Sequence, residues 1–446
     1  MPNVSVPDRT ARVRCALIVL DGLGDRPNAA TGGLSPVEAA ATPNLDRLAA
    51  RGELGQVSLL GPGVAPESDA GVFALLGYDP VRDSPGRGVL EAMGVDLPLE
   101  RGDVALRLNF ATLDPSGRVV DARVGRSLGT EEATRLAAAV TAADLLHDAG
   151  IRAEVRATVG HRGVLWLRPR SGGPLSPNIS NADPFYEKVG GMGRARRPAE
   201  PRLGTVEPLD GSPEAARTAR ALNLLLERVA RVLAEHPVNQ ARRRKGEKEA
   251  TGLLVRNAGA VPDPPPEPFA RRYGLEGAAL TEMPVERGIA KLLGLEDRFV
   301  GPMTGDRDAG YRARAAATAE LLGRFPFVYV HLKGPDEPGH DGDAPRKRDV
   351  VEEIDRAFFG PFVERLDLGA TRVTVTADHA TPCVLKGHSD DPVPWLLVGD
   401  RVRPSTRAAR PVKFGAPVAA RGGTSWFPAS EVLPRLLGAS SPSPRR

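Results

Sequence analysis

The stretch Val13–Leu20, VRCALIVL, followed directly by Asp21-Gly22-Leu23-Gly24-Asp25, decides the fold. Its near-continuous apolar run predicts a strand that is buried on both faces, as strands of parallel sheets are. A carboxylate at the carboxyl end of such a strand stands where open α/β sheets place their chemistry. Asp21 alone carries little weight, because an aspartate after a strand is more often a turn or capping residue.

Three later segments have the same apolar, strand-like character. They are Phe327–His331, Val373–Ala377 and Trp395–Val398. Helix signals alternate with them, as at Thr42-Pro43, where threonine can cap a helix and proline can occupy its first position. This alternation predicts an α/β fold with a doubly wound, mostly parallel sheet.

The middle of the chain has a different pattern, with short strand and helix signals mixed. We therefore expect an α+β domain of residues 96–275, inserted between two parts, 1–95 and 276–446, of one α/β domain. The predicted elements of the insertion are strands at Leu106–Asp114, Arg118–Val124 and Val164–Leu167, and helices at Glu131–Asp148 and from Ser212 to about His236. The tail, Ala439–Arg446, is expected to be disordered.

Composition narrows the class of protein. The chain has 446 residues, which suits two domains, and its 41% hydrophobic and 26% charged residues suit a globular protein with a sizeable core. The small net charge of +4 and the low aromatic content of 4% give no indication of a nucleic-acid partner. We see no signal peptide and no stretch that could span a membrane. With only two cysteines, Cys15 and Cys383, we expect a cytoplasmic protein, and the oligomeric state is left open.

Carboxylates and imidazoles gather after three of the predicted strands, and they include three of the seven histidines. All of them could reach one edge of a sheet, and mixed Asp and His ligands suit Zn²⁺ or Mn²⁺ better than Ca²⁺. The Asp-x-x-x-His spacing shares a face only in a helix, which Pro338-Gly339 argues against. The candidates are Asp21 after the first strand, Asp336 and His340 after the second, and Asp378, His379 and His388 after the third.

Ser68 stands in the Gly- and Pro-rich loop Gly61–Gly71. It can cap a helix that begins near Asp69, and a helix N-terminus would also help to hold a phosphoryl group. A serine hydroxyl is a poor nucleophile unless it is activated, and a metal ion can activate it by stabilising the alkoxide. Ser68 is therefore the candidate nucleophile.

An anionic substrate also needs cationic donors, and arginine suits phosphate and carboxylate because its fork gives paired hydrogen bonds. For each arginine a plain surface role is the alternative. The dense run Arg242–Lys245 is interpreted as a solvated face. The candidate substrate-binding arginines are Arg123, Arg126, Arg162, Arg256 and Arg287.

Nine stretches together carry a family resemblance that covers residues 13 to about 437. They are LIVLDGLGDRP, TPNLDRLAARGELG, SDAGVFALLGYDP, GRGVLEAMGV, LNFATLD, VGHRGVLWL, HLKGPDEPGHDGD, TADHATPC and HSDDPVP. With them the chain resembles the archaeal-type cofactor-independent (2,3-bisphosphoglycerate-independent) phosphoglycerate mutases of the alkaline phosphatase superfamily.

The resemblance implies an alkaline phosphatase-like fold with two divalent metal ions, Mn²⁺ or Zn²⁺, with Mg²⁺ or Co²⁺ as alternatives. Residues 1–95 and 276–446 would form the metal-binding phosphoryl-transfer domain, and 96–275 a substrate-binding lid. The resemblance implies that one site uses Asp21, Ser68, Asp378 and His379, and the other Asp336, His340 and His388.

The resemblance also implies a reaction. Ser68 would take the phosphoryl group from 3-phosphoglycerate, and the bound glycerate would then receive it on its 2-hydroxyl. The lid would keep water out, which separates a mutase from a phosphatase. His161, Arg162 and Arg256 match residues that line the substrate site of the family.

Several positions depart from the family pattern. Val72 stands where a histidine is usual in the serine loop, Glu67 precedes the serine, and Arg287 replaces a lysine. An alternative is therefore a related metal-dependent phosphomutase, phosphatase or homoserine-kinase-like enzyme that acts on a different small phosphorylated or phosphonylated acid. A non-catalytic binding protein is a third alternative, although such a protein needs no nucleophilic serine.

Overall fold

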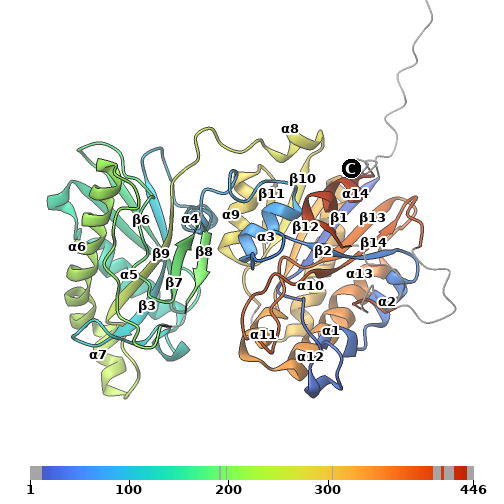
Figure 1. Ribbon diagram of the computed structural model, residues 1–446, viewed down its shortest axis with the longest axis horizontal. Helices are drawn as coiled ribbons and strands as arrows, with labels where there is room; N and C mark the ends of the chain where they lie inside the picture. Colours follow the sequence, from blue (N-terminus) through green and yellow to red (C-terminus); the bar gives the residue numbers. More distant parts are fainter. Residues whose placement is uncertain are drawn as a thin grey trace, which may run out of the picture. The chain divides into compact units, whose positions relative to one another are not determined.

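The computed structural model describes residues 13–189, 192–196, 198–303, 305–404, 413–415 and 426–438, so the predicted tail lies outside the described residues. The chain divides into two compact units, which are coloured along the sequence in Figure 1. The first unit comprises the described residues of Met1–Pro80, Glu267–Met283 and Leu293–Arg446. The second comprises those of Val81–Pro266 and Pro284–Leu292.

The unit boundaries differ from the expected 96–275 insertion because two helices join the second unit. Helix α4 (Arg87–Gly94) and helix α9 (Pro284–Leu292) pack against each other. A Cβ at Gly94 would lie 1.9 Å from Pro284 O, and one at Gly288 would lie 1.9 Å from Leu90 O. The two helices can approach this closely only because glycines stand at the contact.

A mostly parallel sheet of eight strands forms the centre of the first unit. Its strands are β1 (Arg14–Leu20), β2 (Glu53–Ser58), β10 (Gly277–Thr281), β11 (Glu296–Phe299), β12 (Phe327–Leu332), β13 (Thr371–Thr376), β14 (Val393–Gly399) and β15 (Trp426–Pro428). Their order is β11-β10-β12-β1-β13-β14-β2-β15. Strand β14 runs antiparallel to both neighbours, and the other pairs are parallel.

Strand β1 lies between β12 and β13 and forms the middle of the core. From Ala16 to Leu20 its residues are completely buried, as the apolar run predicts. Because β1 is parallel to both neighbours, the residues that follow all three strands lie at the same edge of the sheet. The predicted α/β class and mostly parallel sheet are confirmed.

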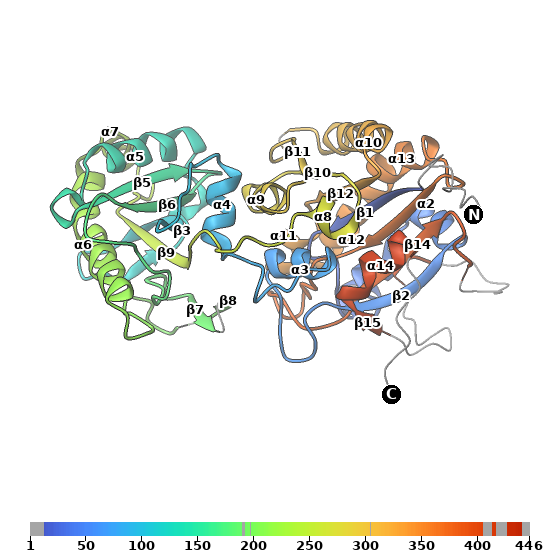
Figure 2. The same ribbon diagram turned by 90° about the horizontal axis from the view of Figure 1, so that it is seen from above.

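Helices cover both faces of this sheet. Helix α10 (Arg307–Arg324) packs on β10, β12 and β1, helix α14 (Val432–Leu437) packs on β1 and β13, and Figure 2 shows them on opposite sides. The other helices of the unit are α1 (Pro36–Ala39), α2 (Pro43–Ala49), α3 (Ser68–Leu75), α8 (Phe269–Tyr273), α11 (Asp336–Asp341), α12 (Ala344–Ile354) and α13 (Gly360–Glu364). A π-helical turn at Asp355–Phe359 and short 3₁₀ turns at Ala29–Thr31 and Ala429–Glu431 complete it. This double covering is the predicted doubly wound arrangement.

Helix α11 corrects one expectation. Pro338-Gly339 argued against a helix, yet Asp336–Asp341 is helical. Pro338 is the third residue of the helix, where the backbone N–H would have no intrahelical partner, so proline costs no hydrogen bond there. Asp336 and His340 therefore share one helical face after all.

The second unit is an antiparallel α+β structure. Strand β3 (Val104–Leu113) pairs with β4 (Val119–Asp121), β6 (Arg162–Pro169) and β9 (Gly252–Gly259), and β5 (Ile151–Ala157) pairs with β6. Helices α5 (Thr130–Ala142), α6 (Pro213–Glu235) and α7 (Pro237–Arg244) share a hydrophobic core with the sheet. Helix α4 packs on β3, β6 and β9 through a separate core cluster. A small hairpin, β7 (Tyr186–Val189) and β8 (Met192–Ala195), forms a separate two-stranded sheet.

Two predicted elements of this unit were too long. The helix expected at Glu131–Asp148 ends at Ala142, because Asp144 has a φ of 44°, and only a short turn follows at His147–Ala149. The strand expected at Arg118–Val124 is confined to Val119–Asp121, since Val124 has a φ of 51°. In neither case does the apolar pattern reveal the left-handed residue. Within the described residues, no helix is long and apolar enough to cross a membrane.

A buried ion pair joins α12 to the segment that follows β1. Lys347 Nζ donates to Asp25 Oδ2 at 2.9 Å, to Gly24 O at 3.1 Å and to Thr381 O at 2.9 Å. Both charged side chains are completely buried. Asp25 also accepts from the backbone N–H of Cys383 at 3.1 Å. The pair therefore ties the segments after β1 and β13 to one helix.

Lys347→Met should destabilise the first unit by about 3–5 kcal/mol, because it leaves the Asp25 carboxylate buried without its cation. Arg26 forms an ion pair with Asp391 at 2.8 Å, but both side chains are partly exposed. Arg26→Met should therefore cost about 1 kcal/mol or less. Urea unfolding followed by circular dichroism measures both variants, and equal losses would contradict the role of burial.

Candidate active site

The loops after β1, β12 and β13 meet at the carboxyl edge of the sheet in the first unit. Isolated backbone bridges join Gly24 to Ala380, and the N–H of Gly22 donates to Asp378 Oδ1 at 3.1 Å. A Cβ at Gly22 would lie 2.7 Å from Asp336 Oδ1, so the three loops are in direct contact. The fold thus brings together side chains that are more than 300 positions apart in the sequence.

Asp21, Asp378 and His379 form one group of candidate metal ligands. One ligand atom of each lies within 4.8 Å of the others, and all three residues are buried. His379 Nε2 is 3.4 Å from Asp21 Oδ1 and 3.5 Å from Asp378 Oδ2. Ligands of a tetrahedral ion bound at 2.0–2.1 Å are roughly 3.3–3.4 Å from one another, so these separations suit a shared cation.

The charges of this group favour a cation as well. Asp21 Oδ1 and Asp378 Oδ2 are buried and accept no hydrogen bond from a described residue, which is costly for a carboxylate. Burial raises the pKa of Asp378, and the charge of Asp21 raises it further. Burial also opposes ionisation of Asp21, but the Lys333 ammonium at 3.1 Å holds the pKa of that carboxyl well below its usual range. Burial lowers the pKa of His379, yet the charges of Asp378 and Asp21 raise it overall.

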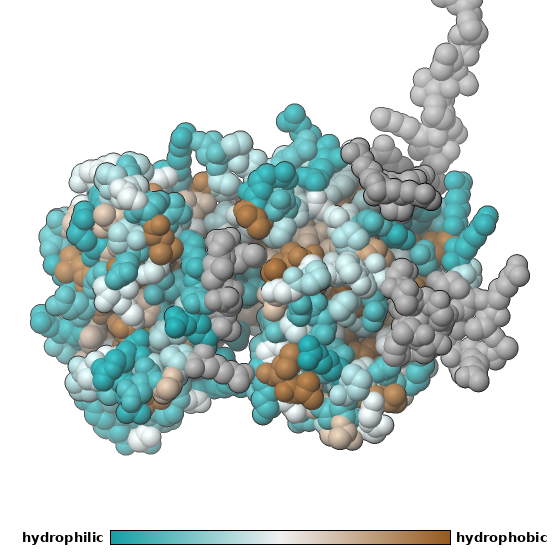
Figure 3. Space-filling view, in the orientation of Figure 1, coloured by the Kyte–Doolittle hydropathy of each residue, from teal (hydrophilic) through white to brown (hydrophobic). Residues whose placement is uncertain are grey.

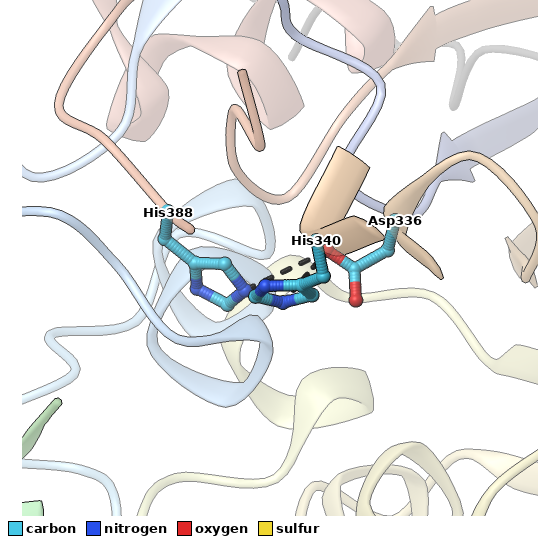
Figure 4. Close-up of side chains that lie close together, drawn as sticks. All are labelled: Asp336, His340 and His388. Atoms are coloured by element: carbon cyan, nitrogen blue, oxygen red, sulfur yellow. Dashed lines mark ion pairs between the residues drawn. The ribbon is translucent and has the colours of Figure 1, made fainter. Parts of the chain in front are cut away.

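Asp336, His340 and His388 form a second group, drawn in Figure 4. Asp336 and His340 are one turn apart on α11, and His388 comes from the segment before β14. Asp336 Oδ1 is 3.5 Å from His340 Nε2 and 3.6 Å from His388 Nε2. The side chains are 21–42% exposed, so this group is more open than the first.

In both histidines of the second group, Nδ1 contacts a backbone carbonyl oxygen. His388 Nδ1 lies 2.8 Å from Pro66 O, and His340 Nδ1 lies 3.4 Å from Lys386 O. A carbonyl oxygen can only accept, so each Nδ1 donates, and in the neutral ring the lone pair of each Nε2 faces Asp336. Histidines that bind metals are held in this way, with one nitrogen on a protein acceptor and the other toward the ion.

The two groups are neighbours. The rings of His379 and His388 stack with their centroids 3.7 Å apart and an interplanar angle of 21°. Asp336 Oδ1 is 4.0 Å from His379 Nδ1. The six candidate ligand side chains therefore form two adjacent sets, grouped as the resemblance implies.

Ser68 is the first residue of α3 and lies against the first group. Its Oγ is 3.3 Å from His379 Nε2, and the residue is buried. One turn later, a Cβ at Gly71 would lie 1.9 Å from Asp378 O, so only glycine lets the helix approach the loop after β13. The N-terminus of α3, which favours negative charge, is thus held beside the ligands together with the Ser68 hydroxyl.

Two further residues of the first unit touch this group and were missed in the sequence. Lys333 follows β12 and pairs with Asp21, and the fully buried His331 has its Nε2 3.7 Å from both Asp21 Oδ1 and Asp378 Oδ2. The sequence pattern predicts only a strand position for His331. His331 is paired with Val19 of β1, and Val19 stands two positions before Asp21. The position of His331 near Asp21 can therefore be recognised only when the strand pairing is known.

The predicted substrate-binding arginines belong to the second unit. Arg162 of β6 stands opposite Asn109 of β3, and Arg256 of β9 stands opposite Arg107 of β3. Residues two apart on a strand share a face, so Arg107, Arg162 and Arg256 lie on one face of the sheet. Arg256 also pairs with the buried Asp183.

A buried carboxylate on α4, Glu91, organises this arginine cluster. Arg87 Nε donates to Glu91 Oε1 at 3.0 Å, and Arg107 Nε is 3.5 Å from the same oxygen. Burial and the charge of Arg87 lower the pKa of Arg107 to about 9. Arg162 forms no ion pair with a described carboxylate, so the cluster has positive charge available for an anion. Arg87, Glu91 and Arg107 were not singled out in the sequence.

Two more of the predicted arginines, Arg123 and Arg126, lie on a strained turn. Val124 and Arg126 have φ values of 51° and 56°, and Asn257, beside Arg256, has 55°. Residues other than glycine rarely adopt a positive φ, and such backbone strain occurs mostly at functional sites. The charges of Arg123 and Arg126 contribute to the lowered pKa of His161, which places this turn near the cluster.

Arg287 has a different environment. It lies on α9, where its guanidinium donates to Gly94 O and to Asp96 Oδ2, both at 2.7 Å. These contacts fasten α9 to the end of α4.

Comparisons with known proteins give a consistent result. A family model described as 2,3-bisphosphoglycerate-independent phosphoglycerate mutase matches residues 49–239. A protein of that name from Aeropyrum pernix is 45% identical over 408 residues, which cover 91% of this chain and 94% of the relative.

Two solved structures are similar over nearly their whole length. A cofactor-independent phosphoglycerate mutase from Thermoplasma acidophilum is 31% identical with a TM-score of 0.61, covering 96% of this chain and 100% of that one. The PH0037 protein from Pyrococcus horikoshii is 29% identical with a TM-score of 0.77, covering 97% of this chain and 99% of that one.

Histidine 161 provides a test of the arginine cluster by pH. Burial, followed by the charge of Arg162, lowers the pKa of His161 to about 3 from its ordinary 6.5. Between these values only the unfolded chain binds the proton, so acid favours unfolding in this window, and stability rises with pH through it. The wild type should lose more stability between pH 7.5 and 4.5 than His161→Gln does.

Urea unfolding at both pH values measures this difference. His147→Gln is the control, because His147 is 77% exposed in the same unit. A difference between wild type and His161→Gln that does not change with pH would contradict the buried, cationic environment of His161.

Proposed function

From the premise that this chain belongs to the 2,3-bisphosphoglycerate-independent phosphoglycerate mutase family, we propose that it interconverts 3-phosphoglycerate and 2-phosphoglycerate through a phosphoserine at Ser68. The reaction belongs to glycolysis, and the cytoplasm is its expected compartment. No finding favours a phosphatase, a homoserine-kinase-like enzyme or another phosphomutase.

The position of Ser68 is the observation that carries this proposal. The hydroxyl is buried at the N-terminus of α3, 3.3 Å from His379 Nε2, beside two oxygens that accept no hydrogen bond from a described residue. A serine used only to cap a helix needs no such neighbours. A nucleophile on which negative charge develops is stabilised by nearby positive charge, which cationic side chains or bound cations can supply.

The donor sets fit divalent metal ions. We propose that Asp21, Ser68, Asp378 and His379 hold one ion, and that Asp336, His340 and His388 hold the other. Nitrogen and oxygen donors without thiolate suit Mn²⁺ or Zn²⁺, with Mg²⁺ or Co²⁺ as alternatives. Bound ions would lower the pKa of the Ser68 hydroxyl and offset the charge of the phosphoryl group.

The chemistry then takes two balanced half-reactions. Ser68 Oγ forms a bond to phosphorus as the bond from phosphorus to the 3-oxygen breaks, and the proton that serine loses is matched by the proton that glycerate gains. Glycerate reorients, and its 2-oxygen takes the phosphoryl group back while Ser68 regains a proton. The N-terminus of α3 stabilises the phosphoserine between the two steps.

We propose that the second unit supplies the groups that recognise the substrate. Arg107, Arg162 and Arg256 share a face of its sheet, and Arg123 and Arg126 lie on the strained turn. Paired guanidinium hydrogen bonds suit both the phosphate and the carboxylate of a phosphoglycerate. The unit would also act as the lid that keeps water from the phosphoserine.

Ser68→Ala should reduce the interconversion of 3- and 2-phosphoglycerate by about 10⁴-fold or more, because no other hydroxyl takes its place. A coupled assay with Mn²⁺ and without added bisphosphoglycerate measures the rate. Ser58→Ala removes another buried serine, at the end of β2, and should leave the rate unchanged. A Ser68→Ala enzyme that retains turnover would refute the nucleophile.

Arg162→Ala should lower kcat/KM by about 10- to 100-fold, the effect of losing hydrogen bonds to a charged group. Arg287→Ala should change it far less, since Asp96 and the end of α4 hold that side chain. The same coupled assay compares the two variants. Equal effects would show that recognition does not depend on the arginine cluster around Glu91.

A further inference from the structure

Thr381 bridges the two ligand groups through one hydroxyl. Its Oγ1 lies 2.7 Å from Asp336 Oδ1 of the second group and 3.0 Å from His379 Nδ1 of the first. The residue is completely buried in the loop after β13. No other described side chain forms hydrogen bonds to ligands of both groups.

The hydrogen-bond roles follow from the chemistry of the three groups. An ionised carboxylate can only accept, so the single proton of the Thr381 hydroxyl goes to Asp336. The oxygen of the hydroxyl is then an acceptor for His379, whose Nδ1 must carry the ring proton. This leaves the lone pair of His379 on Nε2, which faces Asp21, Asp378 and Ser68.

The backbone of Thr381 is held firmly in place. Its N–H donates to Gly24 O at 3.0 Å, and its carbonyl accepts from Lys347 Nζ at 2.9 Å. Gly22 and Gly339 pack closely against the Thr381 side chain. A Cβ at Gly22 would lie 2.7 Å from Thr381 Oγ1, and one at Gly339 would lie 2.9 Å from Thr381 Cγ2. The hydroxyl therefore has one position, fixed by the segments after β1, β12 and β13.

We propose that Thr381 is a positioning residue for both metal sites, which it couples through one hydroxyl: the proton fixes the orientation of Asp336, and the oxygen fixes the tautomer of His379. The inference rests on the proposed metal centre. His340 and His388 are oriented instead by backbone carbonyl oxygens, and each of these carbonyls contacts a ligand of the second group only. Residues that orient metal ligands in this way contribute strongly to metal affinity.

Thr381→Val isolates the hydroxyl, because valine has nearly the same shape as threonine but carries a methyl group in place of the hydroxyl donor and acceptor. The test titrates purified, metal-stripped full-length protein with Mn²⁺ at constant pH, by calorimetry and by the electron paramagnetic resonance of free Mn²⁺. Wild type should bind two ions. Thr381→Val should bind both about 10- to 100-fold more weakly, and Thr381→Ser, which retains the hydroxyl, should bind close to wild type.

Thr318→Val is the matched control. Thr318 is equally buried in the first unit, and its hydroxyl donates to Arg314 O within α10, a helix that supplies none of the candidate ligands. It should bind both ions as the wild type does. Urea unfolding in EDTA checks that Thr381→Val and Thr318→Val are folded in the metal-free state in which the titration begins.

Four results would overturn the proposal. They are unchanged Mn²⁺ affinity in Thr381→Val, weakening of one ion only, equal weakening in Thr381→Ser, and equal weakening in Thr318→Val. Failure of the proposed function is distinguishable, because wild-type protein would then bind two ions without interconverting the phosphoglycerates.

Discussion

Three carboxylates, Asp21, Asp336 and Asp378, meet at one edge of the sheet in the first unit, and their mutual repulsion constrains the site. Asp21 acts electrostatically on both of the others and opposes their ionisation. Collecting buried negative charge is unfavourable unless cations or donors compensate it. The surrounding Lys333, the histidines and the backbone N–H of Gly22 supply part of that compensation. Two oxygens, Asp21 Oδ1 and Asp378 Oδ2, still accept no hydrogen bond from a described residue, which supports the proposal that a cation binds at this edge.

The fold brings these charges together by topology and by close packing. Strands β12, β1 and β13 are adjacent and parallel, so the chain delivers three distant loops to one edge. Gly22 and Gly71 have no side chains, so the loops and α3 can approach one another without a clash. The buried ion pair between Lys347 and Asp25 connects two of the loops to α12. Ser68 reaches His379 only because this packing is so close.

The sequence predicted the parts of this arrangement that depend on short patterns. Buried apolar runs revealed β1, β12, β13 and β14, and the polar residues after three of them are the six candidate ligands that the structure brings together. The grouping into two sets came from the resemblance, because spacing carries no information on which loops touch. The helix at Asp336–Asp341 was missed because proline was treated as a helix breaker, although it stands in the first turn.

Residues that act through tertiary contact could not be predicted. Lys333 and Thr381 are ordinary residues in sequence and gain their roles only from the atoms that they face. In the second unit, Arg162 and Arg256 were predicted, while Glu91 and Arg107 emerge from the packing of α4 on β3. The positive φ of Val124, which ends a predicted strand, also reflects its surroundings rather than its own preference.

The central claim is that this edge of the sheet holds two metal ions beside Ser68. Anomalous diffraction at the manganese edge, from crystals grown with Mn²⁺, tests it most directly. The account predicts two peaks, one among Asp21, Asp378 and His379 and one among Asp336, His340 and His388. A map without a peak at either position, with Lys333 remaining as the cation that pairs with Asp21, would contradict it.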